Sequence, residues 1–260
     1  MLNDKLKREI ESFQELWPGG SNPSKMGWST AVAELAKRGT YVEKIVGHCI
    51  TPYITPEARV LDIGTNGGFW LLPMQDAKEI IGMDVLPADH LNFWSNVNSR
   101  MSSENAAKVK FKHVTDFSCC EVEDNSLDLV YSYDVFCHIS LEGSVEYLRN
   151  LYPKMKKGAS AFIMIADDSK YPRDETGMKG RNKLMLRAGF TNWEDFVEDD
   201  GELSQVSGRW YFYGRDKFCA AAEELGYRVV SPDCAEDMDR KCPIVHLEKP
   251  EEKTFSNERV

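Results

Sequence analysis

The chain has 260 residues, a length that suits one large domain with a cap, and 42% of them are hydrophobic, which is enough for a packed core. Its formal net charge of −10 works against nucleic acid backbones and anionic membranes as partners. The seven cysteines include no C-x-x-C pair, and no apolar stretch reaches the roughly 18 residues of a membrane span. We therefore expect a cytoplasmic protein with reduced thiols and with neither a nucleic acid nor a membrane as partner.

The first part of the chain shows helical patterns. Residues 4–17 have the charged, amphipathic pattern of a helix and lack the apolar core of a signal peptide. A second helix is predicted over residues 30–49, with Ser29 or Thr30 as its N-cap. We group residues 1–54 as an N-terminal helical cap.

Short apolar runs then alternate with helical stretches. Seven strands are predicted, at residues 59–63, 80–84, 110–114, 127–132, 160–166, 227–231 and 243–248. The helical stretches lie near residues 69–77, 88–105, 134–155 and 215–225. This alternation favours an α/β fold, with a doubly wound parallel sheet that has helices on both faces. Ligands of such sheets bind beyond the carboxyl ends of the strands.

One long segment interrupts the alternation. Residues 167–209 are rich in charge, Gly and Asn and show little periodicity. Loops of this length in a compact domain are usually functional, so we interpret this one as a lid or substrate-binding insertion. The α/β domain then covers residues 55–250, and residues 251–260 form a flexible tail.

A glycine-rich loop follows the first predicted strand, in the stretch V60-L-D-I-G-T-N-G-G-F-W70. A phosphate-binding P-loop requires G-x-x-x-x-G-K-[ST], and no Lys-Ser or Lys-Thr pair is present here. The dinucleotide fingerprint G-x-G-x-x-G fails at its second glycine. The pattern that remains is Asp62-x-Gly64-x-x-x-Gly68.

This pattern resembles the first motif of the class I S-adenosylmethionine-dependent methyltransferases, D/E-x-G-x-x-x-G at the end of the first strand. The resemblance covers roughly residues 55–250 and is strongest for the small-molecule branch of the family. It implies a seven-stranded Rossmann-like methyltransferase sheet, with the N-terminal cap and the lid insertion added to it. It also implies S-adenosyl-L-methionine as cofactor and S-adenosyl-L-homocysteine as product.

The resemblance assigns cofactor contacts to two strand ends. Asp62 would attract the cofactor's ammonium, and Asp84, at the end of I80-I-G-M-D84, would accept hydrogen bonds from the ribose hydroxyls. The loop and the helix after it would offer backbone N–H groups to the cofactor's carboxylate. The remaining residues expected at this part of the cofactor are Thr65, Asn66, Gly67 and Val85.

Two further segments extend this assignment. In V114-T-D-F117, Asp116 would hold the adenine amino group and Phe117 would pack on the ring. An Asx-turn for Asp116 and a core position for Phe117 are the alternatives. The stretch that ends in S132-Y-D-V-F-C-H138 resembles the fourth strand of the small-molecule branch, which places Ser132 and Tyr133 at the cofactor.

His138 is the candidate general base for a hydroxyl acceptor, because an imidazole titrates near neutrality. Asp134 precedes it by four residues, so on a helix the carboxylate would face and orient the imidazole. A structural role beside the cofactor is the alternative for His138. Asp134, Asp167 and Asp168 occupy places where some O-methyltransferases hold a divalent cation, but acids at strand ends are commonly only solvated. We expect no metal site.

The acceptor is expected at the insertion. Basic residues gather in residues 169–188, where they form either a site for an anionic substrate or a solvated helix face. Aromatic residues in G208-R-W-Y-F-Y-G214 would line the pocket or anchor the lid, and Trp28 would close it from the N-terminal side. The candidate substrate-binding residues are Trp28, Lys170, Arg173, Arg181, Arg209, Tyr211 and Tyr213.

The sequence therefore predicts an enzyme that transfers a methyl group from S-adenosylmethionine to oxygen of a small polar metabolite. An anionic acceptor of phosphoryl or sugar and capsule type is favoured by the basic stretch. Two alternatives stay open: a small-molecule N-methyltransferase, which needs little base catalysis, and a cofactor-binding module without turnover. No pattern in the sequence indicates an oligomeric state.

Overall fold

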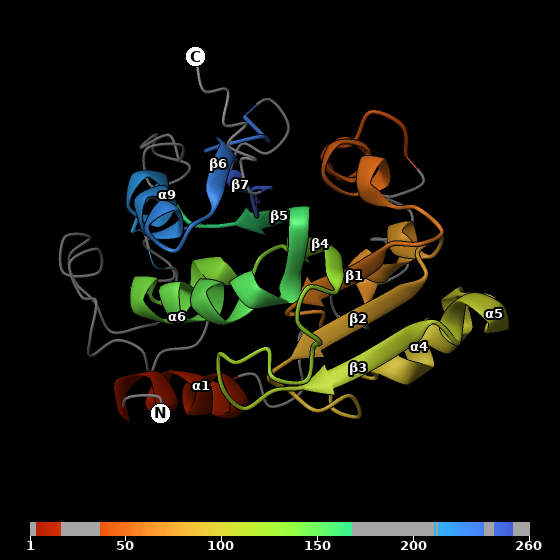
Figure 1. Cartoon of the computed structure of the whole chain (residues 1–260). Coiled ribbons are helices and arrows are strands. Elements are labelled where there is room, and N and C mark those ends of the chain that lie inside the picture. Colours follow the sequence, from red (N-terminus) through yellow and green to blue (C-terminus); the bar gives the residue numbers. More distant parts are fainter. Residues whose placement is uncertain (1–3, 17–36, 168–210, 212, 237–241, 252–260) are drawn as a thin grey trace, which may run out of the picture.

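The computed structural model describes residues 4–16, 37–167, 211, 213–236 and 242–251. Its centre is a seven-stranded sheet with the strand order β3-β2-β1-β4-β5-β7-β6 (Figure 1). The strands are β1 (Arg59–Ile63), β2 (Glu79–Asp84), β3 (Val109–His113), β4 (Leu127–Ser132), β5 (Met155–Met164), β6 (Arg228–Ser231) and β7 (Ile244–Glu248). The predicted seven-stranded Rossmann-like methyltransferase fold is therefore confirmed.

The sheet is mixed rather than wholly parallel. Strands β1 to β5 pair in parallel, whereas β7 lies antiparallel between β5 and β6. A parallel pair needs a crossover connection, usually a helix, and none lies between β6 and β7 in the part of the chain that the structure describes. The prediction of parallel pairing is thus wrong for the final strand.

Helices and short helical turns cover both faces of the sheet. The α-helices are α1 (Asp4–Leu16), α3 (Tyr41–Ile45), α4 (Phe93–Arg100), α5 (Ser103–Ala106), α6 (Leu141–Leu151) and α9 (Arg215–Glu224). The shorter turns are η1 (Val46–Ile50), η2 (Thr51–Tyr53), η3 (Phe69–Met74), η4 (Phe136–His138) and η5 (Tyr152–Lys154). In the described residues, no helix is long and apolar enough to cross a membrane.

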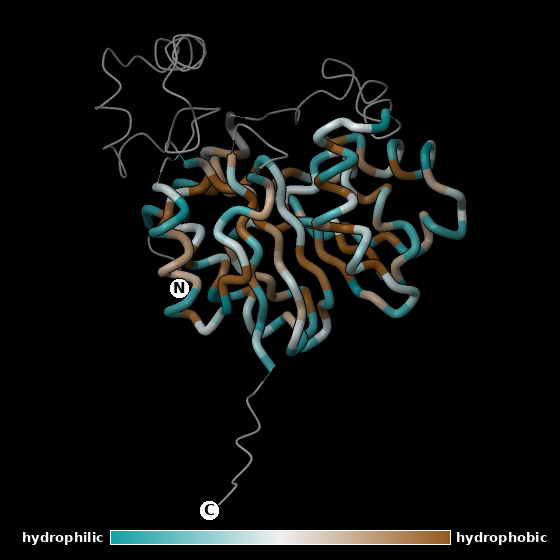
Figure 2. Tube along the Cα trace, turned by 90° about the horizontal axis from the view of Figure 1, so that it is seen from above, coloured by the Kyte–Doolittle hydropathy of each residue, from teal (hydrophilic) through white to brown (hydrophobic). Residues whose placement is uncertain are grey.

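Two hydrophobic clusters lie on the two faces, because neighbouring residues of a strand point to opposite sides. Leu61 belongs to a cluster that includes residues of α1, α6 and α9, whereas Val60 belongs to a cluster that includes residues of η1, η3 and α4. The brown, hydrophobic parts of the tube gather along the strands, with teal segments on the outer turns and helices (Figure 2). This burial of both faces is typical of a doubly wound sheet.

Two predicted helices differ from the sequence pattern within the described residues. In the described part of the helix predicted over 30–49, residues 37–40 form a turn, and α3 begins at Tyr41 with the Thr40 side chain as cap. Likewise α6 begins only at Leu141, where the Ser140 hydroxyl accepts from the Gly143 N–H at 3.0 Å. The residues before it, from Asp134 onward, are therefore free to build a turn at the end of β4.

Candidate functional site

The glycine loop connects β1 to η3 at the carboxyl end of the sheet. The N–H groups of Gly64 and Thr65 both donate to the Met83 carbonyl, at 2.8 and 3.0 Å, and so fasten the loop to β2. Gly64 and Gly68 have φ angles of 71° and 82°, in the left-handed region that favours glycine. The loop is thus a tight turn fixed by its backbone.

Gly64 also lies against the segment that follows β4. A Cβ atom at this position would stand 2.9 Å from Cγ1 of Val135 and closer still to Cγ2. Only a residue without a side chain allows this approach. The contact brings the glycine loop together with the candidate base segment, as the sequence prediction requires.

The loop carries no free backbone donor in the conformation seen here. Besides the two bonds to Met83, Asn66 N–H donates to Oδ2 of Asp84 at 2.8 Å, and Gly68 N–H donates to the Thr65 carbonyl at 2.8 Å. The Gly67 N–H donates to the Asn66 side chain at 2.7 Å. An anion at this loop would therefore have to displace the side-chain oxygen of Asn66 from the Gly67 N–H, whereas we expected free N–H groups.

Asp62 is the most unusual group of the site. Its side chain is 1% exposed, and among the described residues its Oδ2 atom has no hydrogen-bond partner. Burial raises the pKa of Asp62 to about 7; the neighbouring Thr65 hydroxyl lowers this pKa, and the charge of Asp84 raises it further. The Oγ1 atom of Thr65 is likewise buried without a partner. Such orphaned polar atoms indicate a missing ligand or water.

Asp84 closes β2 beside this loop. Its Oδ2 accepts from Asn66 N–H at 2.8 Å, and its Oδ1 accepts from Leu86 N–H at 2.9 Å. Burial raises the pKa of Asp84, while these backbone donors lower it. An ionised carboxylate has about four lone-pair positions, so acceptor capacity remains for a ligand hydroxyl. Nearby, the His113 ring contacts the Val85 carbonyl at 3.0 Å, so Val85 lies at the same edge.

An aromatic group lies beside the loop, and the sequence analysis did not select its central member. Trp70 stands with its ring centroid 5.1 Å from that of Tyr131 and 5.0 Å from that of Tyr133. Ser132, between the two tyrosines, instead donates its hydroxyl to the Ile63 carbonyl at 3.0 Å. The F69-W70 pair directly after the glycines was the available signal for this group.

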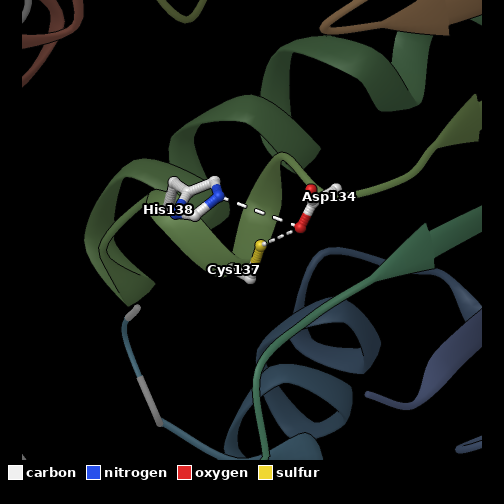
Figure 3. A group of neighbouring side chains, drawn as sticks. All are labelled: Asp134, Cys137 and His138. Atoms are coloured by element: carbon white, nitrogen blue, oxygen red, sulfur yellow. Dashed lines mark hydrogen bonds and ion pairs between the residues drawn. The ribbon is translucent and has the colours of Figure 1, made fainter. Parts of the chain in front are cut away.

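The turn after β4 brings Asp134, Cys137 and His138 together (Figure 3). Nε2 of His138 lies 3.9 Å from Oδ1 of Asp134, and the Cys137 thiol donates to the same oxygen at 3.6 Å. The predicted pairing of Asp134 with His138 thus occurs, but not on a helix. Asp134 has a φ of 62° and precedes the short turn η4, whose tight curvature brings the side chains close. The sequence analysis missed Cys137.

Three residues, Tyr211, Tyr213 and Glu9, hold this turn and Ser140 after it through hydrogen bonds. Tyr211 N–H donates to the Cys137 carbonyl at 2.8 Å, and the Tyr213 hydroxyl donates to the Phe136 carbonyl at 3.1 Å. On the other side, Glu9 of α1 accepts from Ser140 N–H at 2.6 Å and from the Ser140 hydroxyl at 2.7 Å. Both tyrosines were expected to contact substrate, and here they brace the turn.

Asp116 and Phe117 were expected at the adenine ring, with an Asx-turn and a core position as the alternatives, and the structure shows both alternatives. Oδ1 of Asp116 accepts from Ser118 N–H at 2.9 Å, which is an Asx-turn. Phe117 is 2% exposed and packs edge-on against Tyr147, with the ring centroids 5.6 Å apart. Asp167, which was weighed as a metal ligand, accepts from Arg215 N–H at 3.2 Å and lies 3.5 Å from Nε of the same arginine.

Several expected site residues lie outside the described residues. These are Trp28, Lys170, Arg173, Arg181 and Arg209 of the substrate group, and Asp168 of the weighed metal ligands. The described part of the site therefore consists of two buried carboxylates, the glycine loop and the turn from Asp134 to His138. The buried carboxylate of Asp62 can accept a cationic group, and the turn that carries the His138 imidazole contacts the glycine loop through Val135.

Comparison with known proteins agrees with this geometry. A family described as methyltransferase domain matches residues 34–232. No curated protein matches the sequence.

Similar folds occur among solved structures. The mitomycin 7-O-methyltransferase MmcR has a TM-score of 0.58 and 14% identity, over 91% of this chain and 60% of that chain. A Bordetella parapertussis protein described as a possible exported protein has a TM-score of 0.57 and 16% identity, over 81% and 68%. A Listeria monocytogenes protein described as S-adenosylmethionine-dependent methyltransferase has a TM-score of 0.52 and 13% identity, over 83% and 100%. At these identities the likeness concerns the fold alone.

Proposed function

Because the chain belongs to this family of S-adenosylmethionine-dependent methyltransferase domains, we propose that it methylates oxygen of a small polar metabolite. We further propose that this acceptor is anionic, of phosphoryl or sugar and capsule type. The support for an anion is the basic composition of residues 169–188, which lie outside the described part of the chain. The support for the donor lies in the site itself.

The single observation that carries the proposal is the unpartnered, buried Oδ2 of Asp62. S-adenosylmethionine supplies an electrophilic methyl group on a sulfonium and carries an ammonium at its amino-acid end. A buried carboxylate with a raised pKa is destabilised as an anion, and a cation beside it removes that penalty. Asp62 and Thr65 therefore offer the cationic end the acceptors that the protein leaves unsatisfied.

The other end of the cofactor is assigned to Asp84, whose remaining lone pairs are available for ribose hydroxyls. The cofactor's carboxylate would require the Asn66 side chain to turn away and release the Gly67 N–H. We propose that this local rearrangement accompanies binding. Asn66 has a φ of 49°, so its backbone already holds the left-handed conformation of the turn.

For the acceptor, we propose His138 as general base and Asp134 as the group that orients it. Nε2 of His138 would take the proton of the acceptor hydroxyl, and the carboxylate of Asp134 would stabilise the resulting imidazolium. The Val135–Gly64 contact supports this role, because it places the base segment directly on the cofactor loop. General-base catalysis of this kind contributes about 10²–10⁴-fold to a rate.

A second candidate function is N-methylation. Trp70 and Tyr133 have half-buried rings with centroids 5.0 Å apart, and Tyr133 directly precedes Asp134, whose side chain is 58% exposed. Aromatic faces with a nearby carboxylate favour a cationic amine as ligand. An amine acceptor needs little base catalysis, so substitution of His138 separates the two candidates.

Calorimetry tests the donor first. We expect S-adenosylmethionine and S-adenosylhomocysteine to bind the purified chain with one site, and D62A to weaken binding at least tenfold. C120A, at an exposed cysteine that is not part of the loop, is the control and should leave binding unchanged. Absence of binding by either molecule would refute the proposal. Release of S-adenosylhomocysteine with phosphorylated sugars, neutral sugars or amines then identifies the acceptor class.

A further inference from the structure

The turn after β4 gathers three side chains of metal-ligand type within a stretch of five residues. One carboxylate oxygen of Asp134, the Sγ of Cys137 and one ring nitrogen of His138 all lie within 4.8 Å of one another. In Figure 3 the thiol and the imidazole both point toward the Asp134 carboxylate. From this convergence we propose that Asp134, Cys137 and His138 bind one soft divalent cation of the zinc class.

The spacing of the ligand atoms supports this assignment. With bond lengths of about 2.0–2.3 Å and tetrahedral angles, the ligand atoms around zinc stand about 3.3–3.6 Å apart. The Asp134 oxygen lies 3.6 Å from Sγ of Cys137 and 3.9 Å from Nε2 of His138. Both distances from the Asp134 oxygen are thus within a few tenths of an ångström of those around zinc, and the Sγ and ring nitrogen lie within 4.8 Å of each other, so side-chain rotations would complete the site.

The donor set selects the kind of ion. A thiolate and an imidazole prefer zinc, cobalt or copper, whereas magnesium and calcium require oxygen donors. Three protein ligands with a fourth position open is also the ligand number of catalytic zinc sites. The sequence-based expectation of no metal site weighed Asp134 with Asp167 and Asp168, and so did not include this mixed donor set.

Access and support of the site are also consistent with binding. The Asp134 side chain is 58% exposed, so an ion can reach the site from solvent through this residue, whereas Cys137 is fully buried. The Cys137 carbonyl is held by Tyr211 N–H at 2.8 Å, which fixes the backbone that carries the thiol. On binding, the metal–sulfur bond replaces the S–H bond, and the thiol proton leaves to solvent.

Binding would occupy the same Nε2 atom that the proposed base uses. A bound cation and base catalysis by His138 are therefore alternative uses of the same side chain. The site itself does not depend on the proposed function, so it is tested without an acceptor and without turnover.

The test is titration of the untagged, reduced chain with Co²⁺, followed by displacement with Zn²⁺. We expect one equivalent to bind with a thiolate-to-cobalt charge-transfer absorption, and Zn²⁺ to abolish it. C137S should remove this absorption, D134N should weaken binding at least tenfold, and C120S should change neither. Because D134N alters an exposed side chain, it reports on the site even if C137S folds poorly.

Three results would overturn the proposal. One is the absence of charge-transfer absorption at saturating Co²⁺ in the folded protein. A second is a Co²⁺ affinity that D134N leaves unchanged, or an absorption that persists in folded C137S, since the ligands would then lie elsewhere in the chain. Displacement by Mg²⁺ at a concentration similar to that of Zn²⁺ would equally contradict the assignment of a soft ion.

Discussion

Replacing Gly64 with alanine tests the link between the cofactor loop and the candidate base segment. The new Cβ would meet the two methyl groups of Val135, with Cγ1 at 2.9 Å and Cγ2 closer. The left-handed φ of 71° adds a backbone penalty of about 1–2 kcal/mol. Overpacking of a buried contact adds about 1–3 kcal/mol, so G64A should lower the free energy of unfolding by about 2–5 kcal/mol.

Gly39 provides the matched control for the backbone part of this effect. It also has a left-handed φ, of 77°, but a Cβ there would meet nothing within 4 Å. G39A should therefore show only the penalty of about 1–2 kcal/mol. Urea denaturation of both variants measures the difference, provided that the slope of the transition is unchanged.

The double variant G64A/V135A isolates the contact. V135A removes the two methyl groups that obstruct the new Cβ, so part of the loss should be recovered. We expect a coupling free energy of about 1–3 kcal/mol between the two positions. Equal losses for G64A and G39A, together with no coupling to V135A, would refute the inference that the two segments touch.

Three further predictions concern the carboxylates and the imidazole. Because the pKa of Asp62 rises from 3.8 to about 7 on folding, the folded protein loses stability as the pH rises through that window. D62N should therefore add up to about 4 kcal/mol to the free energy of unfolding at pH 8 and little at pH 4. An equal gain at both pH values would contradict the raised pKa. E9A leaves the buried N–H and hydroxyl of Ser140 without the Glu9 acceptors and should lower the free energy of unfolding in urea by about 2–5 kcal/mol. E9Q keeps one acceptor and should lower it clearly less. Equal losses would argue against the hydrogen bonds as the cause. H138A should lower the release of S-adenosylhomocysteine with a hydroxyl acceptor by about 10²–10⁴-fold without changing cofactor affinity, whereas turnover that stays nearly intact would favour an amine acceptor.

Local patterns were sufficient to predict most of the fold. Apolar runs bounded by turn residues place β1 and β4 at the predicted residues, and the other strands begin or end within one or two residues, apart from the start of β5. The direction of β7 was not predictable from such patterns. The direction depends on the edge of the sheet that the strand joins. That edge is decided by contacts between residues that are adjacent in the sheet but distant in sequence.

The site shows the same division between local and distant information. The spacing of Asp62, Gly64 and Gly68 singled out the loop because a tight turn imposes its requirements on neighbouring residues. Glu9 was not found, because its partner Ser140 lies 131 positions away and an acid on an amphipathic helix looks like any solvated charge. Cys137 was missed because only the acids Asp134, Asp167 and Asp168 were weighed as metal ligands, although residues three apart share a face of a helix as well.

The position of β7 between β5 and β6 also has a consequence for synthesis of the protein. Among the described strands, β6 pairs with β7 alone, and β5 has β4 on one side and β7 on the other. Until residues 244–248 have left the ribosome, β6 has no place in the sheet and β5 keeps an open edge. Open edges of this kind invite pairing with other chains. A nascent chain that stops before Ile244 would thus lose two strands rather than one, and its need for a chaperone should fall once residues 244–248 have emerged.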